Sequence, residues 1–200
     1  MFKKLLFITR PLRYSIDRFF YMQRGESSSL LPLKNKYKNK PMLVVGNGPS
    51  LNDTPFESFV GIPAIGMNKI DLLYPQTDWR PSFVLTANTL VVKQHWQSML
   101  ETGIDIYLSS KSRFFVPGNA KNKFKYFLSN SNSDFSRDIT KGIGSAGTVT
   151  YTALQFAYYC GANPVILFGV DHSFKMDGNP NEIKKRESED VNHFHPDYFA

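Results

Sequence analysis

The chain has 200 residues, of which 42% are hydrophobic and 20% charged, so it can bury the core of one domain, and wholesale disorder is excluded. Its net charge of +7 is concentrated in residues 1–40, which carry ten lysines and arginines against two acids. A nucleic-acid-binding protein needs its basic face on the folded domain, so this distribution argues against one. The single cysteine, Cys160, excludes an internal disulfide and indicates a buried structural thiol, rather than a reactive one, in the reducing cytoplasm.

Residues 1–40 are interpreted as a basic amphipathic leader and a linker. The leader's uninterrupted apolar run, Leu5 to Ile8, is too short for a signal peptide or a membrane span. Beyond Pro11, a helix would carry four apolar residues on one face, beside arginines: Leu12, Ile16, Phe19 and Phe20. Such a helix either lies on the anionic inner face of the membrane, through residues 1–24, or packs on the body of the protein. The polar residues 25–41 are typical of a linker.

Short apolar runs between turn residues predict five strands in residues 41–200: Met42–Val45, Ala64–Met67, Phe83–Thr86, Ile104–Leu108 and Val165–Phe168. Helical spacing is found in Thr89–Glu101 and in residues 147–160, with Gly161 as a stop. Alternating strands and helices predict one α/β domain, a Rossmann-like, doubly wound and mostly parallel sheet. The polar residues 175–192 are predicted to form a mobile loop. The chain stops at Ala200 without a closing helix, which we interpret as an incomplete C-terminus.

Polar residues follow four of the predicted strands. Asn68 and Asn88 each come just after an apolar strand, the first strand runs into Gly46-Asn47-Gly48-Pro49-Ser50, and the last runs into Gly169-Val170-Asp171. Ligands collect at the carboxyl ends of the strands in sheets of this class. The pattern therefore indicates a ligand site, with simple turn formation as the alternative.

The loop Gly46-Asn47-Gly48-Pro49-Ser50 turns sharply. We expect its glycines to allow positive φ angles and a close backbone approach to a ligand, although a tight strand-to-helix turn explains them equally well. Leu51 stands where the dinucleotide fingerprint has its third glycine, and no Gly-Lys-Ser/Thr follows. A hydride-transfer enzyme and a Walker-type ATPase are therefore unsupported.

A second small-residue loop, "GIGSAGTVT" at 142–150, precedes the clearer helix. Ser145 is the expected N-cap, and the amides of Gly147 and Thr148 are expected to form an anion site suited to phosphate. A closely packed helix start is the alternative. The two loops on one rim are explained best together by a nucleotide or nucleotide-sugar site.

These segments, together with "TYTALQFAYYCGANPVILFGVDHSF" and "NHFHPDYF", resemble the bacterial family of flagellin-modifying Maf proteins, which shares a domain with archaeal 6-hydroxymethylpterin diphosphokinases. A more distant resemblance is to the bacterial sialyltransferases that use CMP-sialic acid, which carry Thr-Ser-Gly where this chain has Gly-Ser-Ala-Gly. The likeness covers residues 41–199. It implies a Rossmann-like domain that binds a nucleotide or a CMP-sugar.

The resemblance also implies roles for individual residues. Asn47 would contact the phosphate or ribose, Asn68 and Asn88 would reach the nucleotide from neighbouring strand ends, and the Ser145–Gly147 turn would hold its base and phosphate side. His193 or His195 would be the general base. The implied binding residues are Gly46, Asn47, Gly48, Pro49, Ser50, Asn68, Asn88, Ser145, Ala146, Gly147 and Thr148, and the catalytic candidates are His193, His195 and Asp171.

The predicted chemistry is glycosyl transfer from a CMP-sugar to a glycan or protein acceptor, with a histidine deprotonating the acceptor. Because no Asp-X-Asp occurs, we expect a mechanism without metal or other cofactor. The first alternative is pyrophosphoryl transfer from ATP to a hydroxymethylpterin, with Mg²⁺ held by Asp171 and Asp177. An inert nucleotide-sugar-binding module is the second. For the two histidines, a structural role or a zinc site with Asp171 and His172 also stays open.

Overall fold

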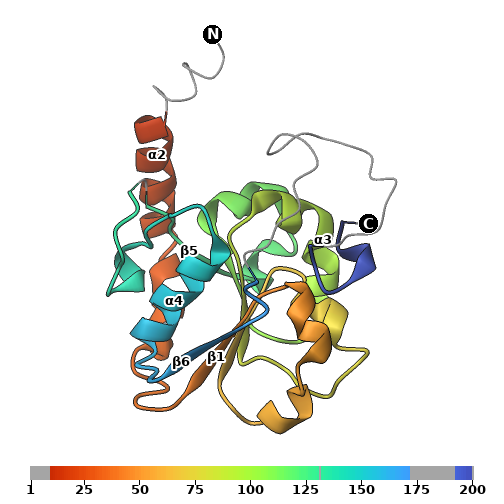
Figure 1. The fold of residues 1–200 in the computed structure, drawn as a ribbon. Coiled ribbons are helices and arrows are strands. Elements are labelled where there is room, and N and C mark those ends of the chain that lie inside the picture. The colour runs from red at the N-terminus through yellow and green to blue at the C-terminus, as the bar shows by residue number, and fades with distance from the viewer. Residues whose placement is uncertain (1–9, 131, 172–191, 200) are drawn as a thin grey trace.

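Six short strands form one parallel sheet with helices on both of its faces (Figure 1). The computed structural model describes residues 10–130, 132–171 and 192–199. The strands are β1 (Met42–Val45), β2 (Ala64–Met67), β3 (Phe83–Thr86), β4 (Ile106–Ser109), β5 (Lys125–Phe127) and β6 (Val165–Phe168). The α-helices are α2 (Arg10–Gln23), α3 (Thr89–Glu101) and α4 (Val149–Tyr159). The predicted α/β, Rossmann-like, doubly wound sheet is confirmed, and it is parallel throughout.

The strand order is β5-β4-β3-β2-β1-β6. The chain therefore adds four strands on one side of β1 and then returns, through α4, to place β6 on the other side. This reversal puts the topological switch point between β1 and β6, where Met42 pairs with Val165 and Val45 with Phe168. In sheets of this class the ligand crevice lies beyond the carboxyl ends of the strands at the switch point.

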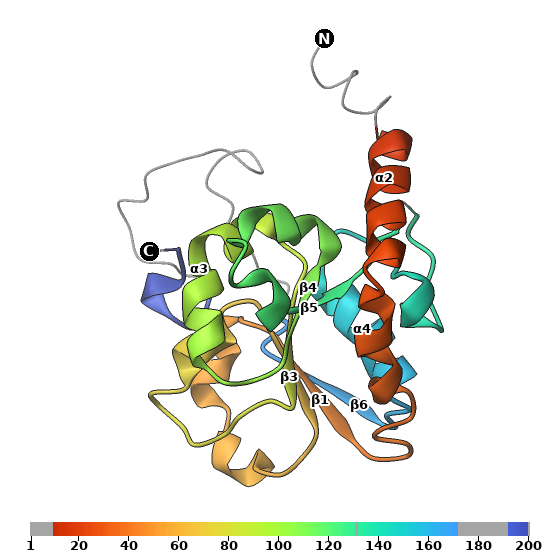
Figure 2. The same cartoon turned by 180° about the vertical axis from the view of Figure 1, so that it is seen from behind.

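Two apolar layers hold the sheet between its helices. On one face, Leu43, Val84 and Leu108 pack with Val92 and Met99 of α3. On the other, strand residues of alternating register pack against Ala153 and Phe156 of α4: Met42, Val44, Ile65, Phe83, Leu85 and Tyr107. Seen from behind, the sheet separates α3 from α4 (Figure 2). Because both faces are covered, the central strands are continuous apolar runs, as expected for a parallel sheet.

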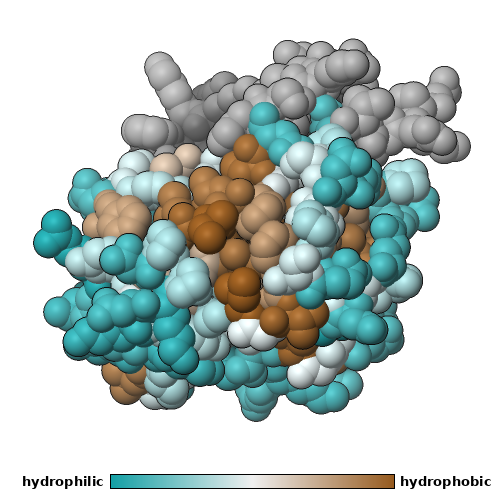
Figure 3. Space-filling view, turned by 60° about the horizontal axis from the view of Figure 1, so that its bottom comes forward, coloured by the Kyte–Doolittle hydropathy of each residue, from teal (hydrophilic) through white to brown (hydrophobic). Residues whose placement is uncertain are grey.

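The β6 strand forms one edge of the sheet, and its apolar residues are only partly covered. Ile166 and Leu167 are 40% and 47% exposed. In Figure 3, hydrophobic side chains gather in the middle of the face that includes this edge, within a hydrophilic surround. The edge is the least covered part of the sheet.

The structure corrects the interpretation of residues 25–41 as a linker. A 3₁₀ helix, Glu26–Leu33, follows α2 and buries Leu30 and Leu33 in the core on the α4 side. The backbone amides of Asn35 and Tyr37 then donate to the carbonyls of Tyr159 and Cys160. Leu30 and Leu33 thus anchor this mostly polar segment in the core. The predicted loop at 175–192 lies, apart from residue 192, outside the described residues.

Candidate functional site

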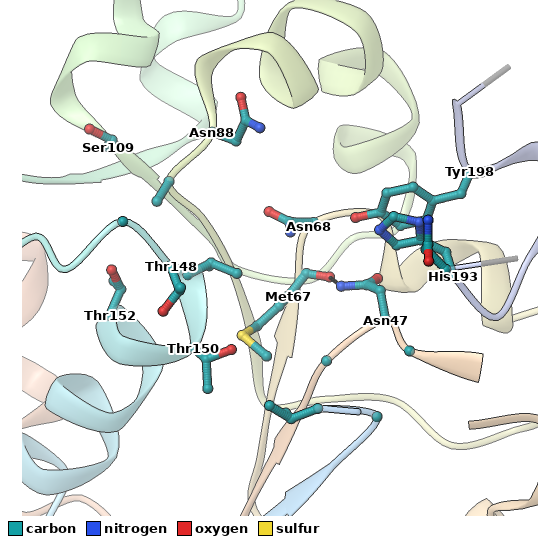
Figure 4. A pocket seen from close by; sticks show the side chains of 18 of the residues that line it. Asn47, Met67, Asn68, Asn88, Ser109, Thr148, Thr150, Thr152, His193 and Tyr198 are labelled. Atoms are coloured by element: carbon teal, nitrogen blue, oxygen red, sulfur yellow. Dashed lines mark hydrogen bonds between the residues drawn. The ribbon is translucent and has the colours of Figure 1, made fainter. Parts of the chain in front are cut away.

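A cleft of about 760 Å³ opens at the carboxyl ends of the strands, beside the switch point. This volume lies within the range of small-molecule sites. One wall consists of residues that follow β1, β2 and β3, and the opposite wall is the N-terminal turn of α4 (Figure 4). Of the residues predicted from the sequence, the cleft is lined by Gly46, Asn47, Gly48, Pro49, Asn68, Asn88, Ser145, Gly147, Thr148, Asp171 and His193, whereas Ser50, Ala146 and His195 do not line it.

The glycines of the first loop are required by its contact with the end of β6. The amide of Gly48 donates to the Gly169 carbonyl at 2.9 Å. A Cβ on Gly46 would lie 2.2 Å from that carbonyl oxygen, and one on Gly48 would lie 2.3 Å from an Asp171 carboxylate oxygen. Neither glycine has a positive φ. The prediction that they serve a positive φ is therefore wrong, and the close approach is to the protein's own chain.

Asp171 holds this loop in place. One of its carboxylate oxygens accepts a hydrogen bond from the Ser50 amide at 2.9 Å, and the other accepts one from the Ser50 hydroxyl. Both oxygens of Asp171 are thus engaged by one residue on the neighbouring strand's loop. Ser50 and Asp171 contribute to the cleft by fixing the shape of its floor.

Asn47 and Asn68 bring unused hydrogen-bond acceptors to the cleft. The Asn47 side chain donates from Nδ2 to the Met67 carbonyl at 3.0 Å (Figure 4). Its Oδ1 is therefore the atom that can still accept a hydrogen bond. Oδ1 of Asn47 and Oδ1 of Asn68 are both buried and accept no hydrogen bond within the described part of the chain. Burying a polar atom without a partner is costly. Two such atoms on one wall therefore favour a ligand that donates hydrogen bonds.

Asn88 has a local structural role in addition to its place on the cleft wall. It is the N-cap of α3, and its Oδ1 accepts from the Leu90 amide at 2.9 Å. This bond satisfies one of the amides that a helix start leaves unpaired. The side chain thus fixes the start of α3 at the rim of the cleft.

The helix α4 begins later than the sequence predicted for the second loop, residues 142–150. Thr148, not Ser145, is the N-cap, with its Oγ1 accepting from the Tyr151 amide at 3.2 Å. The helix begins at Val149, so the amides with no partner inside the helix are those of Val149 and Thr150. Both residues line the cleft. The positive end of α4 therefore meets the cleft, one turn later along the chain than expected.

Gln155, fully buried on α4, fixes the path of this loop. Its Oε1 accepts from the amides of Gly144 and Ser136, both at 2.9 Å, and its Nε2 donates to the Gly144 carbonyl at 3.0 Å. Gly144 lies so close to the next segment that a Cβ would meet the Asp134 carbonyl at 1.8 Å. Gln155 could not be identified from the sequence, because its partners are backbone groups on preceding loops, which a helical pattern does not indicate.

The C-terminal segment closes one end of the cleft. The Phe194 amide donates to the Asn47 carbonyl at 2.9 Å, and its ring is buried. His193 lines the cleft and stacks on Tyr198, with ring centroids 3.7 Å apart and planes 7° apart. His195 is instead engaged locally, its Nδ1 accepting from the Asp197 amide at 3.1 Å. Of the two histidines, His193 is the one at the cleft.

Two lysines lie at or beside the cleft. Lys111, which follows β4, lines the cleft directly. Lys69, which follows Asn68, lies behind Tyr198 with its ammonium 5.7 Å from the ring centroid. Burial lowers the pKa of Lys69, while the nearby Asp71 carboxylate acts in the opposite direction. Neither lysine was predicted, although each lies two residues beyond a strand end, a position that could have identified both.

The metal alternatives depend in part on residues outside the described ones, His172 and Asp177. Within residues 10–130, 132–171 and 192–199, no three histidines, cysteines or acids gather as a metal-binding group. Asp171 is the only carboxylate on the described cleft wall, and Ser50 occupies both of its oxygens. The described donors therefore do not by themselves fit Mg²⁺ or Zn²⁺.

No protein-family model matches this chain, and no curated protein matches its sequence.

Proposed function

We propose that this protein is a glycosyltransferase of the Maf-like type, acting in the cytoplasm, that binds a nucleotide sugar and transfers its sugar to a glycan or protein acceptor. We favour a CMP-sugar as the donor. The observation that carries the proposal is the pair of buried, unpartnered Oδ1 atoms of Asn47 and Asn68 on the wall of a switch-point cleft. Ribose hydroxyls and the cytosine amino group are donors that suit such acceptors.

The opposite wall supplies groups that suit a phosphate. The amides of Val149 and Thr150, which have no partner inside the helix, lie at the positive end of α4, and Lys111 is a basic side chain that also lines the cleft. In this proposal the nucleotide spans the cleft, with its ribose and base toward the asparagines and its phosphate toward α4. The volume of about 760 Å³ suffices for a nucleotide with one sugar attached.

In the proposed reaction, the acceptor hydroxyl attacks the anomeric carbon of the donor while the bond from that carbon to the phosphate oxygen breaks. The hydroxyl proton passes to the His193 imidazole, and CMP leaves as the phosphate monoester. The α4 amides and Lys111 stabilise the charge that develops on the phosphate. Tyr198, stacked on His193, holds the imidazole in place.

A panel of nucleotides tests the proposal. CMP is expected to raise the melting temperature by mass action, and UDP and GDP to raise it less. The chain is then expected to release CMP from CMP-sialic acid, with water or an added hydroxyl as acceptor, in the presence of EDTA. Binding without release would indicate an inert nucleotide-sugar-binding module. A response to ATP with Mg²⁺ and none to CMP would instead indicate the pterin diphosphokinase reaction.

A further inference from the structure

Helix α2 stands beside the folded body, with its N-terminal end projecting past it (Figure 1). One face anchors the helix. The Tyr14 hydroxyl donates to Asn130 Oδ1 at 2.8 Å, and the Tyr21 hydroxyl donates to the Tyr126 carbonyl at 3.3 Å. Asp17 accepts a hydrogen bond from the Ser110 hydroxyl at 2.7 Å. These residues are three and four positions apart, so one stripe of the helix is fixed to the protein.

The opposite stripe of α2 is apolar and exposed. Its side chains are Leu12, Ile16, Phe19 and Phe20, which are 64%, 48%, 58% and 46% exposed. Their spacing puts all four on one side of the helix, away from the anchored stripe. Single exposed apolar residues are ordinary, but a continuous row of them, two aromatic, marks a contact surface.

Basic residues border this row. Arg18 and Arg24 are exposed, and the Arg24 guanidinium lies 5.2 Å from the centroid of the Phe20 ring. Asp17, the only acidic residue of α2, accepts a hydrogen bond from Ser110 and so faces the body. Its negative charge therefore does not neutralise the two exposed arginines. The exposed side of α2 is thus apolar along its centre and positive at its border.

The positive surface continues past the end of the helix. Arg24 lines a shallow cavity of about 350 Å³ together with Arg113, Lys121 and Lys125. Arg113 is paired with Glu26 at 2.8 Å, and Lys125 is paired with Asp105. Arg24 and Lys121 therefore carry the excess charge that an anionic group would meet there.

We propose that the exposed face of α2 docks on an anionic lipid bilayer, with its apolar row at the acyl boundary and its arginines among the headgroups. Interfacial helices have this combination of an apolar stripe and basic flanks. Among the described residues, no helix is long and apolar enough to cross a bilayer. The proposal is independent of the chemistry in the cleft.

A second copy of the chain suits this face less well. With about half of each side chain exposed, the row offers roughly 400 Å², half of the ~800 Å² that each partner of a stable dimer buries. Two copies meeting through α2 would also bring like charges from Arg18 and Arg24 together. An anionic bilayer complements those charges, each worth about 1 kcal/mol near such a surface.

Vesicle sedimentation with the full chain tests the proposal. We expect binding to vesicles of equimolar phosphatidylcholine and phosphatidylglycerol, weaker binding to phosphatidylcholine alone, and release as salt is raised. Phe19→Ser should lower the partition coefficient about tenfold, and Arg18→Gln about fivefold. Val60→Ser, at a position 61% exposed in the connection between β1 and β2, is the control and should change nothing.

Unchanged binding of Phe19→Ser, or equal binding to neutral and anionic vesicles, would overturn the proposal. So would a dimer in light scattering that Phe19→Ser dissociates, because a second copy would then be the occupant. Melting curves check that each variant folds, and Ile16→Ser replaces Phe19→Ser if the latter does not. Nucleotide binding by all variants should stay at the wild-type level, which separates this test from that of the cleft.

Discussion

Asp171, in the segment that follows β6, accepts hydrogen bonds from both the amide and the hydroxyl of Ser50, in the loop that follows β1. These two residues join the loops on either side of the switch point. The floor of the cleft therefore depends on a contact between segments that are far apart in the sequence. The effect of Asp171 on a bound ligand would be indirect, because Asp171 holds the loop Gly46–Ser50 in its conformation.

A double-mutant cycle of Ser50→Ala and Asp171→Ala should reveal this coupling. We expect each single variant to lower the free energy of unfolding by about 1 kcal/mol, because the bonds are charge-assisted but exposed to solvent. The double variant should lose less than the sum of the two. Denaturant unfolding measures all four proteins. Strict additivity would mean that the contact contributes nothing to the native state.

Gly48→Ala should destabilise the protein and weaken nucleotide binding. The new methyl group would lie 2.3 Å from an Asp171 carboxylate oxygen, so the loop must shift, at a cost of roughly 1–3 kcal/mol. Gly118→Ala is the matched control, because a Cβ there meets nothing within 4 Å and its φ is not positive. Equal melting temperatures for the two variants would show that the loop tolerates a side chain.

His193→Phe should abolish general-base catalysis while keeping a ring that stacks on Tyr198. We expect turnover to fall by about 10²–10⁴-fold, with CMP affinity and melting temperature nearly unchanged. His195→Ala serves as the control and should retain turnover, since His195 does not line the cleft. The assignment of the base is wrong if the opposite pattern is measured.

Cys160 should be inert in the native protein. Burial raises the pKa of its thiol to about 12, so the thiolate that reacts with disulfide reagents is scarce at neutral pH. Ellman's reagent should therefore modify the chain only after denaturant is added, and the native rate should rise with pH as the thiol ionises. Rapid modification of the folded protein at neutral pH would contradict its burial.

Most of the fold could be predicted because its strands are apolar runs between turn residues. The bounds of β1, β2, β3 and β6 agree with the prediction, as do those of α3. The strand β5 was missed because it has three residues and begins with a lysine, so no period was visible. The leucines of Glu26–Leu33 were also missed, since their burial depends on contacts that a local pattern does not contain.

The residues of the candidate site that follow strand ends could be predicted from the sequence. Asn47, Asn68 and Asn88 lie on the cleft as the parallel-sheet rule requires. The purpose of Gly46 and Gly48 was assigned wrongly because their neighbours, Gly169 and Asp171, are remote in the chain. Gln155 escaped notice for the same reason, since its partners lie on loops that precede its own helix.

The central claim is that the cleft binds a cytidine nucleotide through the acceptor on Asn68, and calorimetric titration with CMP tests it most directly. Asn68 has a positive φ of 51°, so Asn68→Gly removes the side chain without straining the backbone. Asn39→Gly, at a φ of 58° away from the cleft, is the matched control. We expect CMP to bind the wild type and Asn39→Gly equally, and Asn68→Gly about tenfold more weakly, as the loss of one hydrogen bond predicts. Equal binding by all three proteins, or no binding of CMP by the wild type, would contradict the account.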